Sequence, residues 1–143
     1  MAVVVESFVS AHQPTADAVA DLDAQVSRSG ITPHFAFVFY GHHHEDAVID
    51  GFLRSRFPGV PVVGGTSCAG VMSDAGLGGD GSAGLLLLHD PDGSYGSAAA
   101  PLGDDPSATA QATLTRALES AGAAGELPEL VWVYQTPGHE EAV

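Results

Sequence analysis

The sequence predicts an α/β domain built on one mixed, mostly parallel sheet with helices on its faces. Short runs rich in valine and phenylalanine alternate with longer segments whose apolar residues recur every three or four positions. This strand–helix–strand–helix–strand order implies parallel strands joined by right-handed crossovers. The 143 residues, 45% of them apolar, are enough for one core of ordinary size.

The first half of the chain carries three of the expected strands and two helices. Residues 2–9 are rich in Val and Phe, residues 34–41 ("HFAFVFYG") form a continuous apolar run, and "VPVVGG" follows at 60–65. A helix is expected over 14–30, between a proline near its start and a glycine stop, and another over 44–57, where the apolar residues form a broad stripe.

Beyond Gly65 the chain becomes rich in glycine and serine, which predicts a loop with hairpin turns. The runs "AGLLLLH" at 83–89 and "GSYGSAAA" at 93–100 are then expected to be two short strands joined by the turn "DPDG". We therefore expect an antiparallel addition to the sheet.

The C-terminal region predicts one helix and one strand. The helix is expected over 104–122, with Asp105 before a proline in the first turn and Gly122 beyond the end. The run "ELVWVYQT" at 129–136 is expected to form a further strand.

Charge and composition exclude several classes of function. Eighteen acidic residues stand against four basic ones, all arginine, for a formal net charge of −14, so nucleic acid is not expected as a partner. No apolar run approaches the ~20 residues of a membrane helix, and the N-terminus lacks the features of a secretory segment, so a cytoplasmic location without membrane association is expected. A single cysteine excludes an internal disulfide and a Cys-rich zinc site.

A short internal repeat indicates duplication. Residues 38–48 ("VFYGHHHEDAV") and 133–143 ("VYQTPGHEEAV") align without a gap and are identical at five of eleven positions, His44 and His139 among them. We therefore interpret residues 1–135 as one half of a duplicated β-α-β-α-β-β-β unit and residues 136–143 as the truncated start of the second. The missing C-terminal half is then a partner, and residues 136–143 are expected to be frayed or held by another chain.

Cys68, in "TSCAG" at 66–70, is the candidate nucleophile. The run differs by one residue from a Gly-x-Cys-x-Gly elbow, because Thr66 replaces the first glycine. An elbow also needs a helix directly after the nucleophile, and "VMSDAGLGG" does not predict one. We expect no catalytic residue, and a Cys68-dependent hydrolase or amidotransferase remains the alternative.

The same run favours a ligand-binding loop. Gly64 and Gly65 let the backbone turn sharply at the carboxyl end of a strand, Thr66 and Ser67 add hydroxyl groups, and Cys68 is expected to line the cavity. Small ligands bind at this edge of open α/β sheets.

A second candidate segment is "GHHHEDAV", which begins at Gly41. No histidine follows any of its three histidines at the i+4 position, so no metal site is expected. We expect Gly41 and His44 to belong to the ligand site, with His44 capping the following helix or contacting the ligand.

The run "FPGVPVVGGTSCAG" at 57–70 resembles the "PxxPVIGCSTAGE" signature of the FIST domain, and the likeness to the N-terminal part of that domain extends over about residues 2–135. The departures are Gly65 where a cysteine is often found, the additional Cys68, and Val71-Met72 in place of an acidic-aliphatic pair.

The resemblance implies a bacterial or archaeal sensory domain in signal transduction that binds small ligands such as amino acids. Some members look like haem-containing nitric oxide sensors, so haem is a candidate cofactor, with His44 as a candidate axial ligand. The sequence thus predicts a non-enzymatic sensory domain for a small-molecule ligand. A haem-based gas sensor and a purely structural half-domain are further alternatives.

Overall fold

The computed structural model describes residues 2–67, 70–74 and 76–138. The chain divides into two compact units, Met1–Asp92 and Gly93–Val143, each of which is described by itself.

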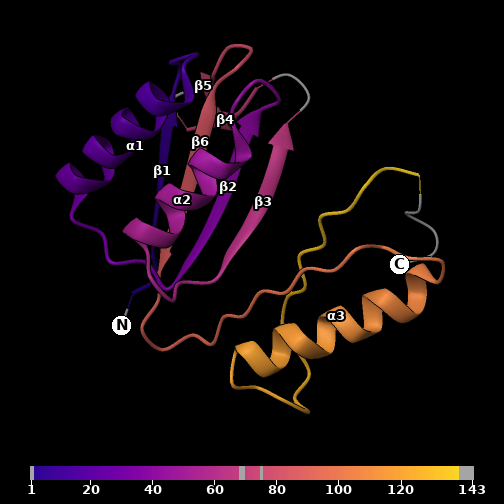
Figure 1. Ribbon diagram of the computed structural model, residues 1–143. Helices are drawn as coiled ribbons and strands as arrows, with labels where there is room; N and C mark the ends of the chain where they lie inside the picture. The colour runs from indigo at the N-terminus through magenta and orange to yellow at the C-terminus, as the bar shows by residue number, and fades with distance from the viewer. Residues whose placement is uncertain (1, 68–69, 75, 139–143) are drawn as a thin grey trace. The chain divides into compact units, whose positions relative to one another are not determined.

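The first unit is built on a four-stranded sheet in the order β1-β6-β2-β3 (Figure 1). Its strands are β1 (Val4–Ser10), β2 (Phe35–Gly41), β3 (Val62–Ser67) and β6 (Ala83–His89). β6 pairs antiparallel with both β1 and β2, whereas β2 and β3 pair in parallel. The predicted mixed α/β sheet is therefore confirmed. β1, β2 and β3 run in the same direction, but β6 lies between β1 and β2, so only one of the pairings is parallel.

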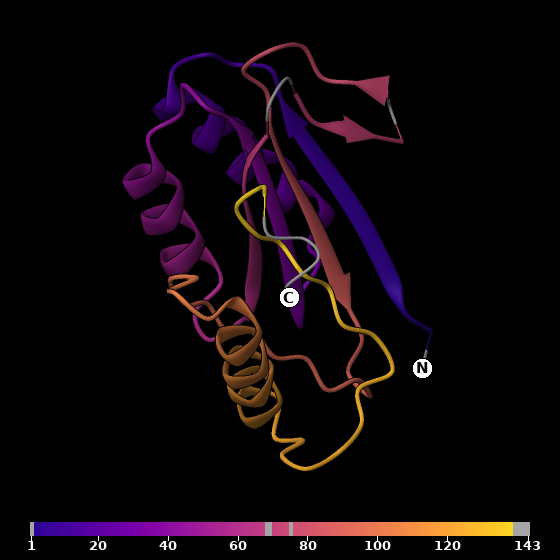
Figure 2. The same ribbon diagram turned by 90° about the vertical axis from the view of Figure 1, so that its right-hand side faces the viewer.

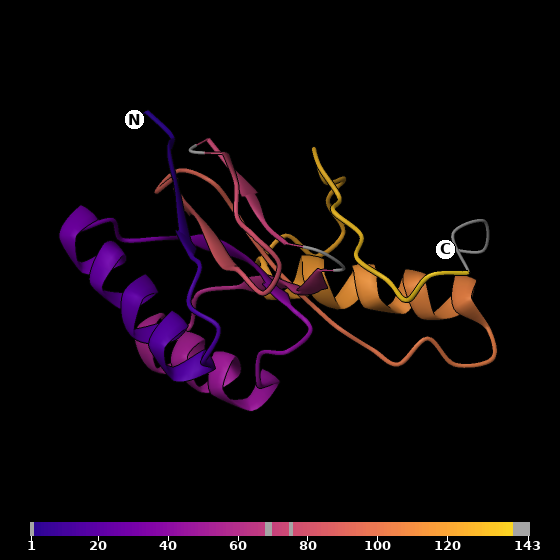
Figure 3. The ribbon, with the colours of Figure 1, turned by 90° about the horizontal axis from the view of Figure 1, so that it is seen from above.

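Helices α1 (Thr15–Ser29) and α2 (Asp46–Arg56) lie on the same face of this sheet (Figure 3). α1 starts directly after Pro14 and ends at Gly30, whose φ of 72° is left-handed and whose N–H donates to the carbonyl of Val26. The helices expected over 14–30 and 44–57 are therefore confirmed.

The core of the unit lies between the sheet and these helices. Because side chains alternate along a strand, one face of β2 and the matching face of β6 point toward the helices. The buried apolar set is Phe8, Ala18, Leu22, Val26, Ala36, Val38, Tyr40, Ile49, Leu53, Phe57, Ala83, Leu85 and Leu87.

A small hairpin follows β3, as the glycine-rich composition predicts. Its strands are β4 (Met72–Ser73) and β5 (Gly76–Leu77), paired antiparallel (Figure 2). The Ser7 hydroxyl on β1 donates to Asp74 Oδ1 at 2.5 Å, which anchors the hairpin to the sheet.

The second unit contains α3 (Pro106–Ser120), where the expected cap is confirmed because Asp105 Oδ1 accepts from the Ala108 N–H at 3.0 Å. The prediction of strands at 93–100 and 129–136 is wrong, since neither segment has strand structure. The first packs irregularly against α3, where a Cβ on Gly96 would lie 2.0 Å from the Ala117 carbonyl oxygen. The second has no neighbouring strand in the described part of the chain, and a lone strand has no hydrogen-bond ladder.

Within the described residues, no helix has the length and apolar character needed to cross a membrane. The expectation for residues 136–143 falls largely on 139–143, which lie outside the described residues.

Candidate ligand-binding site

The carboxyl ends of β2 and β3 meet at one edge of the sheet, and β6 begins at the same edge. Gly41 at the end of β2 is in register with Ser67 at the end of β3, and Tyr40 is in register with Ala83, the first residue of β6. We call this edge, with the loop 41–45, the end of β3 and the turn 79–82, the rim. The rim brings together the two segments that the sequence singled out.

Gly41 allows the turn 79–82 to approach the end of β2. Its N–H donates to the Ser82 carbonyl at 2.9 Å, and a Cβ at this position would lie 2.7 Å from the Cα of Gly81. Since the Gly81 atoms that this Cβ would meet belong to the backbone, a larger residue at position 41 would displace one of the two segments.

His44 is buried at the centre of the rim and is only 4% exposed. Its Nε2 lies 2.7 Å from the Gly81 carbonyl oxygen, and its Nδ1 lies 3.2 Å from Thr15 Oγ1. A carbonyl only accepts, so Nε2 carries the proton in this hydrogen bond. The Thr15 oxygen also accepts from the Glu45 N–H at 3.0 Å, so its hydroxyl proton is available to the unprotonated Nδ1. His44 therefore joins the start of α1, the start of α2 and the turn before β6.

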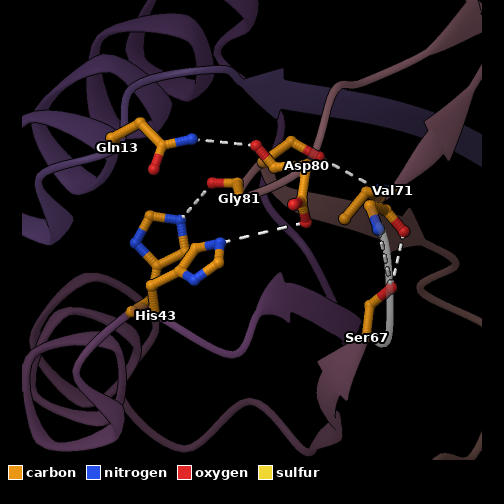
Figure 4. Close-up of polar contacts among 9 residues, drawn as sticks. Gln13, His43, Ser67, Val71, Asp80 and Gly81 are labelled. Atoms are coloured by element: carbon orange, nitrogen blue, oxygen red, sulfur yellow. Dashed lines mark hydrogen bonds and ion pairs between the residues drawn. The ribbon is translucent and has the colours of Figure 1, made fainter.

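The neighbouring histidines are exposed on the rim. The rings of His42 and His43 lie 4.0 Å apart between centroids, and His43 Nε2 lies 3.9 Å from Asp80 Oδ1. Gln13 Nε2 donates to the Asp80 carbonyl at 2.9 Å (Figure 4). These side chains present imidazole, carboxylate and amide groups to solvent next to the end of β2.

The loop after β3 is held by hydroxyl groups. Ser67 Oγ donates to the Gly70 carbonyl at 2.6 Å, and Ser82 Oγ accepts from the Val71 N–H at 3.0 Å. The serine at the end of β3 therefore supports the loop, and its hydroxyl proton is already used. Cys68, the candidate nucleophile, lies outside the described residues.

Gly64 and Gly65 lie inside β3 and do not form the sharp turn expected of them, and Gly64 packs closely within the sheet. A Cβ on Gly64, whose φ is +151°, would lie 1.7 Å from the Val38 carbonyl oxygen, so no larger residue fits. Gly65 is in register with Phe39, and the exposed Thr66 is in register with Tyr40. Of the predicted β3 residues, Thr66 and Ser67 therefore carry the polar side chains nearest the rim.

The structure brings Gly41, Ser67 and His44 to the same edge, as the sequence predicts. The partners of His44 were missed, because Thr15 and Gly81 lie 29 and 37 residues away in the chain and no motif links them to it. The acidic and amide groups of Asp80 and Gln13 were missed for the same reason.

The residues present do not fit an axial haem site at His44. Its Nε2 is bonded to the Gly81 carbonyl and its Nδ1 to Thr15, so neither nitrogen is available to iron in this conformation. Nor do the described residues contain a group of three or more His, Cys, Asp or Glu side chains placed to hold a metal ion. Among the described side chains, the rim carries exposed imidazole, carboxylate and amide groups from His42, His43, Asp80 and Gln13.

Comparison with known proteins agrees with the resemblance seen in the sequence. The model of the FIST N domain matches residues 34–141, which is well over half of the chain. Neither the curated proteins nor the solved structures gave a match. The matched region starts just before β2 and includes both predicted site segments and the turn 79–82. The chain belongs to the FIST N domain family.

Proposed function

We propose that this chain is a non-enzymatic sensory domain that binds a small molecule at the rim. The observation that carries the proposal is the register pairing of Gly41 with Ser67, because the exposed His42 and His43 directly follow Gly41 at the carboxyl ends of β2 and β3. Ligands of open α/β sheets bind at such carboxyl ends.

Family membership supports the sensory part of the proposal. FIST domains are associated with sensory signal transduction. A sensor needs a binding site that is coupled to the rest of the fold. His44 supplies a coupling of this kind, because it ties the loop beside the exposed histidines to α1 and to the turn before β6.

The mixed charge of the rim suggests the class of ligand. His42 and His43 can donate hydrogen bonds to a carboxylate, and Asp80 can pair with an ammonium group. A small zwitterion such as an amino acid satisfies both, in agreement with what the resemblance to the family implies.

The test is an NMR titration of the ¹⁵N-labelled chain with each of the twenty amino acids. We expect at least one to cause saturable shifts of the Gly41, Ser67 and Gly81 amides. The double variant His42→Ala/His43→Ala should lose these shifts and keep its fold, because both rings are exposed. Shifts from none of the amino acids, or shifts confined to other parts of the chain, would contradict the proposal.

Alkylation distinguishes the binding domain from the hydrolase or amidotransferase. Only a thiolate reacts with iodoacetamide, so a catalytic Cys68 would be labelled rapidly near neutral pH. We expect labelling at the rate of an ordinary thiol. Rapid labelling together with amide hydrolysis would favour the enzyme.

A further inference from the structure

The N-terminal end of the sheet's first strand is unusually apolar for an exposed position. Val3, Val4 and Val5 are 53%, 41% and 53% exposed. Successive residues of a strand point to opposite faces, so valine side chains are open to solvent on both faces here. Single exposed apolar residues are common, but a contiguous run of large ones marks an interaction site.

These valines lie at an edge of the sheet. Among the described residues, the four-stranded sheet ends at β1, whose one neighbouring strand is β6 (Figure 2). The hairpin is anchored further along β1, at Ser7. The stretch 3–6 contains no proline, lysine or other feature that discourages pairing with another strand, apart from Glu6.

The charge near this edge is negative. Glu6 lies on β1 itself, and the register of Val4 with His89 brings the following Asp90 close to Val3. Neither β1 nor β6 contains Lys or Arg, and the chain as a whole carries a formal charge of −14. A partner with positive charge is therefore attracted, whereas a second copy of the chain is repelled.

The size of the edge also argues against a second copy. A stable protein–protein interface uses roughly 20–30 residues on each side. Pairing along residues 3–6 supplies only a few from each chain. A single extended segment is held instead by main-chain hydrogen bonds, with alternate side chains giving specificity.

We propose that the outer edge of β1, at residues 3–6, binds an extended segment of another protein in which apolar and basic residues alternate. The segment adds a strand to the sheet. Its apolar side chains cover Val3 and Val5 on one face of the sheet, and its basic side chains lie near Glu6 on the other face. The proposal does not depend on ligand binding at the rim, which is at the opposite end of β1.

The test uses the full chain and a synthetic peptide, acetyl-Lys-Val-Lys-Val-Lys-Val-Lys-amide. We expect saturable shifts of the amides of residues 3–6 by NMR and slower hydrogen exchange there. Val5→Lys should weaken binding at least tenfold, because it adds positive charge and removes an apolar contact. Val3→Lys, which precedes the strand, should act in the same direction and serves if Val5→Lys fails to fold.

Three controls decide the interpretation. Leu77→Lys adds the same charge at a 79% exposed position of the hairpin and should leave the dissociation constant within about twofold. A peptide with proline at its central position should bind at least tenfold more weakly, since it lacks a backbone donor. Equal weakening by Leu77→Lys, or equal binding of the proline peptide, would show charge attraction alone and overturn the proposal. A dimer of the chain that Val5→Lys dissociates would also overturn it, with a second copy as the occupant.

Discussion

The imidazole of His44 donates from Nε2 to the carbonyl oxygen of Gly81 across 2.7 Å, within a site that is almost closed to solvent. The two residues belong to different loops, one after β2 and one before β6. Because the other ring nitrogen contacts Thr15, the side chain connects the loop after β2, the start of α1 and the turn before β6. We call this set of two hydrogen bonds the His44 joint and expect it to hold these three segments of the rim together.

Replacing His44 with alanine is expected to destabilise the fold by about 2–4 kcal/mol. The change leaves the Gly81 carbonyl and the Thr15 hydroxyl without their partner in a buried site and opens a cavity. Urea unfolding followed by circular dichroism measures the effect. His42→Ala is the matched control, and since its ring is exposed we expect a change within about 0.5 kcal/mol. Equal stability of the two variants would show that the joint does not hold the rim.

Thr15 should matter through its hydroxyl group. Thr15→Val keeps the shape of the side chain but removes the acceptor of the Glu45 N–H and the partner of His44. We expect a loss of about 1–3 kcal/mol in the free energy of unfolding. Thr15→Ser retains the hydroxyl and should recover most of it. A serine variant as unstable as the valine variant would instead assign the loss to packing of the methyl group.

Two glycines should respond to alanine in opposite directions. Gly41→Ala places a Cβ 2.7 Å from the Gly81 backbone and should cost about 1–3 kcal/mol. Gly51 lies inside α2, and a Cβ there meets nothing within 4 Å, so Gly51→Ala should stabilise by about 0.5–1 kcal/mol. Denaturant midpoints compare them directly. A Gly41→Ala variant as stable as the parent would mean that the turn 79–82 can move away without cost.

In the second unit, the cap of α3 offers a local test. Asp105→Ala removes the acceptor of the Ala108 N–H and should destabilise the helix by about 1 kcal/mol. Hydrogen exchange of the amides in residues 106–120 should then quicken by about fivefold. Asp104→Ala removes the same charge one residue earlier and should have a smaller effect. Equal acceleration by both would attribute the effect to charge and not to the cap.

Most elements of the first unit follow from the sequence. Val- and Phe-rich runs predict β1 and β2, and the helical stripe with its glycine stop predicts α1, because both patterns report which face of an element is buried. The position of β6 does not follow. Whether a leucine-rich strand pairs beside the preceding hairpin or inserts between two earlier strands depends on contacts distant in sequence.

The two strand predictions that proved wrong, at 93–100 and 129–136, failed for different reasons. The run 93–100 is composed mainly of Gly, Ser and Ala, which have weak strand preference, and its Gly96 lies close against the end of α3. The run 129–136 has a strong strand pattern, and its apolar side chains from Leu130 to Tyr134 are exposed. A pattern of this kind predicts a strand only where a neighbouring strand completes the ladder.

The sequence predicts which strand ends meet at the candidate site, but not how the side chains there are arranged. Parallel strands end at one edge, so the sequence places Gly41 near Ser67. It also selects His44, which it expects to cap the following helix or to contact the ligand, whereas the structure turns the side chain inward to Thr15 and Gly81. The exposed imidazoles are those of His42 and His43.

The ion pair of Asp50 with Arg54 on α2 gives a prediction about pH. Arg54 Nε donates to Asp50 Oδ2 at 2.7 Å, and this hydrogen bond lowers the pKa of the Asp50 carboxyl from its ordinary value of 3.8. A lowered pKa means that the pair stabilises the folded state above the ordinary pKa and that this contribution is lost as the pH falls through the lowered one. Arg54→Gln should therefore raise the pKa of Asp50, measured by an NMR titration of its carboxyl carbon.

Arg56→Gln, which removes the pair with Asp23 instead, should leave the Asp50 titration unchanged. Because both side chains of the Asp50–Arg54 pair are exposed, high salt should reduce the difference between parent and variant. A parent whose Asp50 titrates at the same pH as in Arg54→Gln at low salt would show that the pair does not persist in solution.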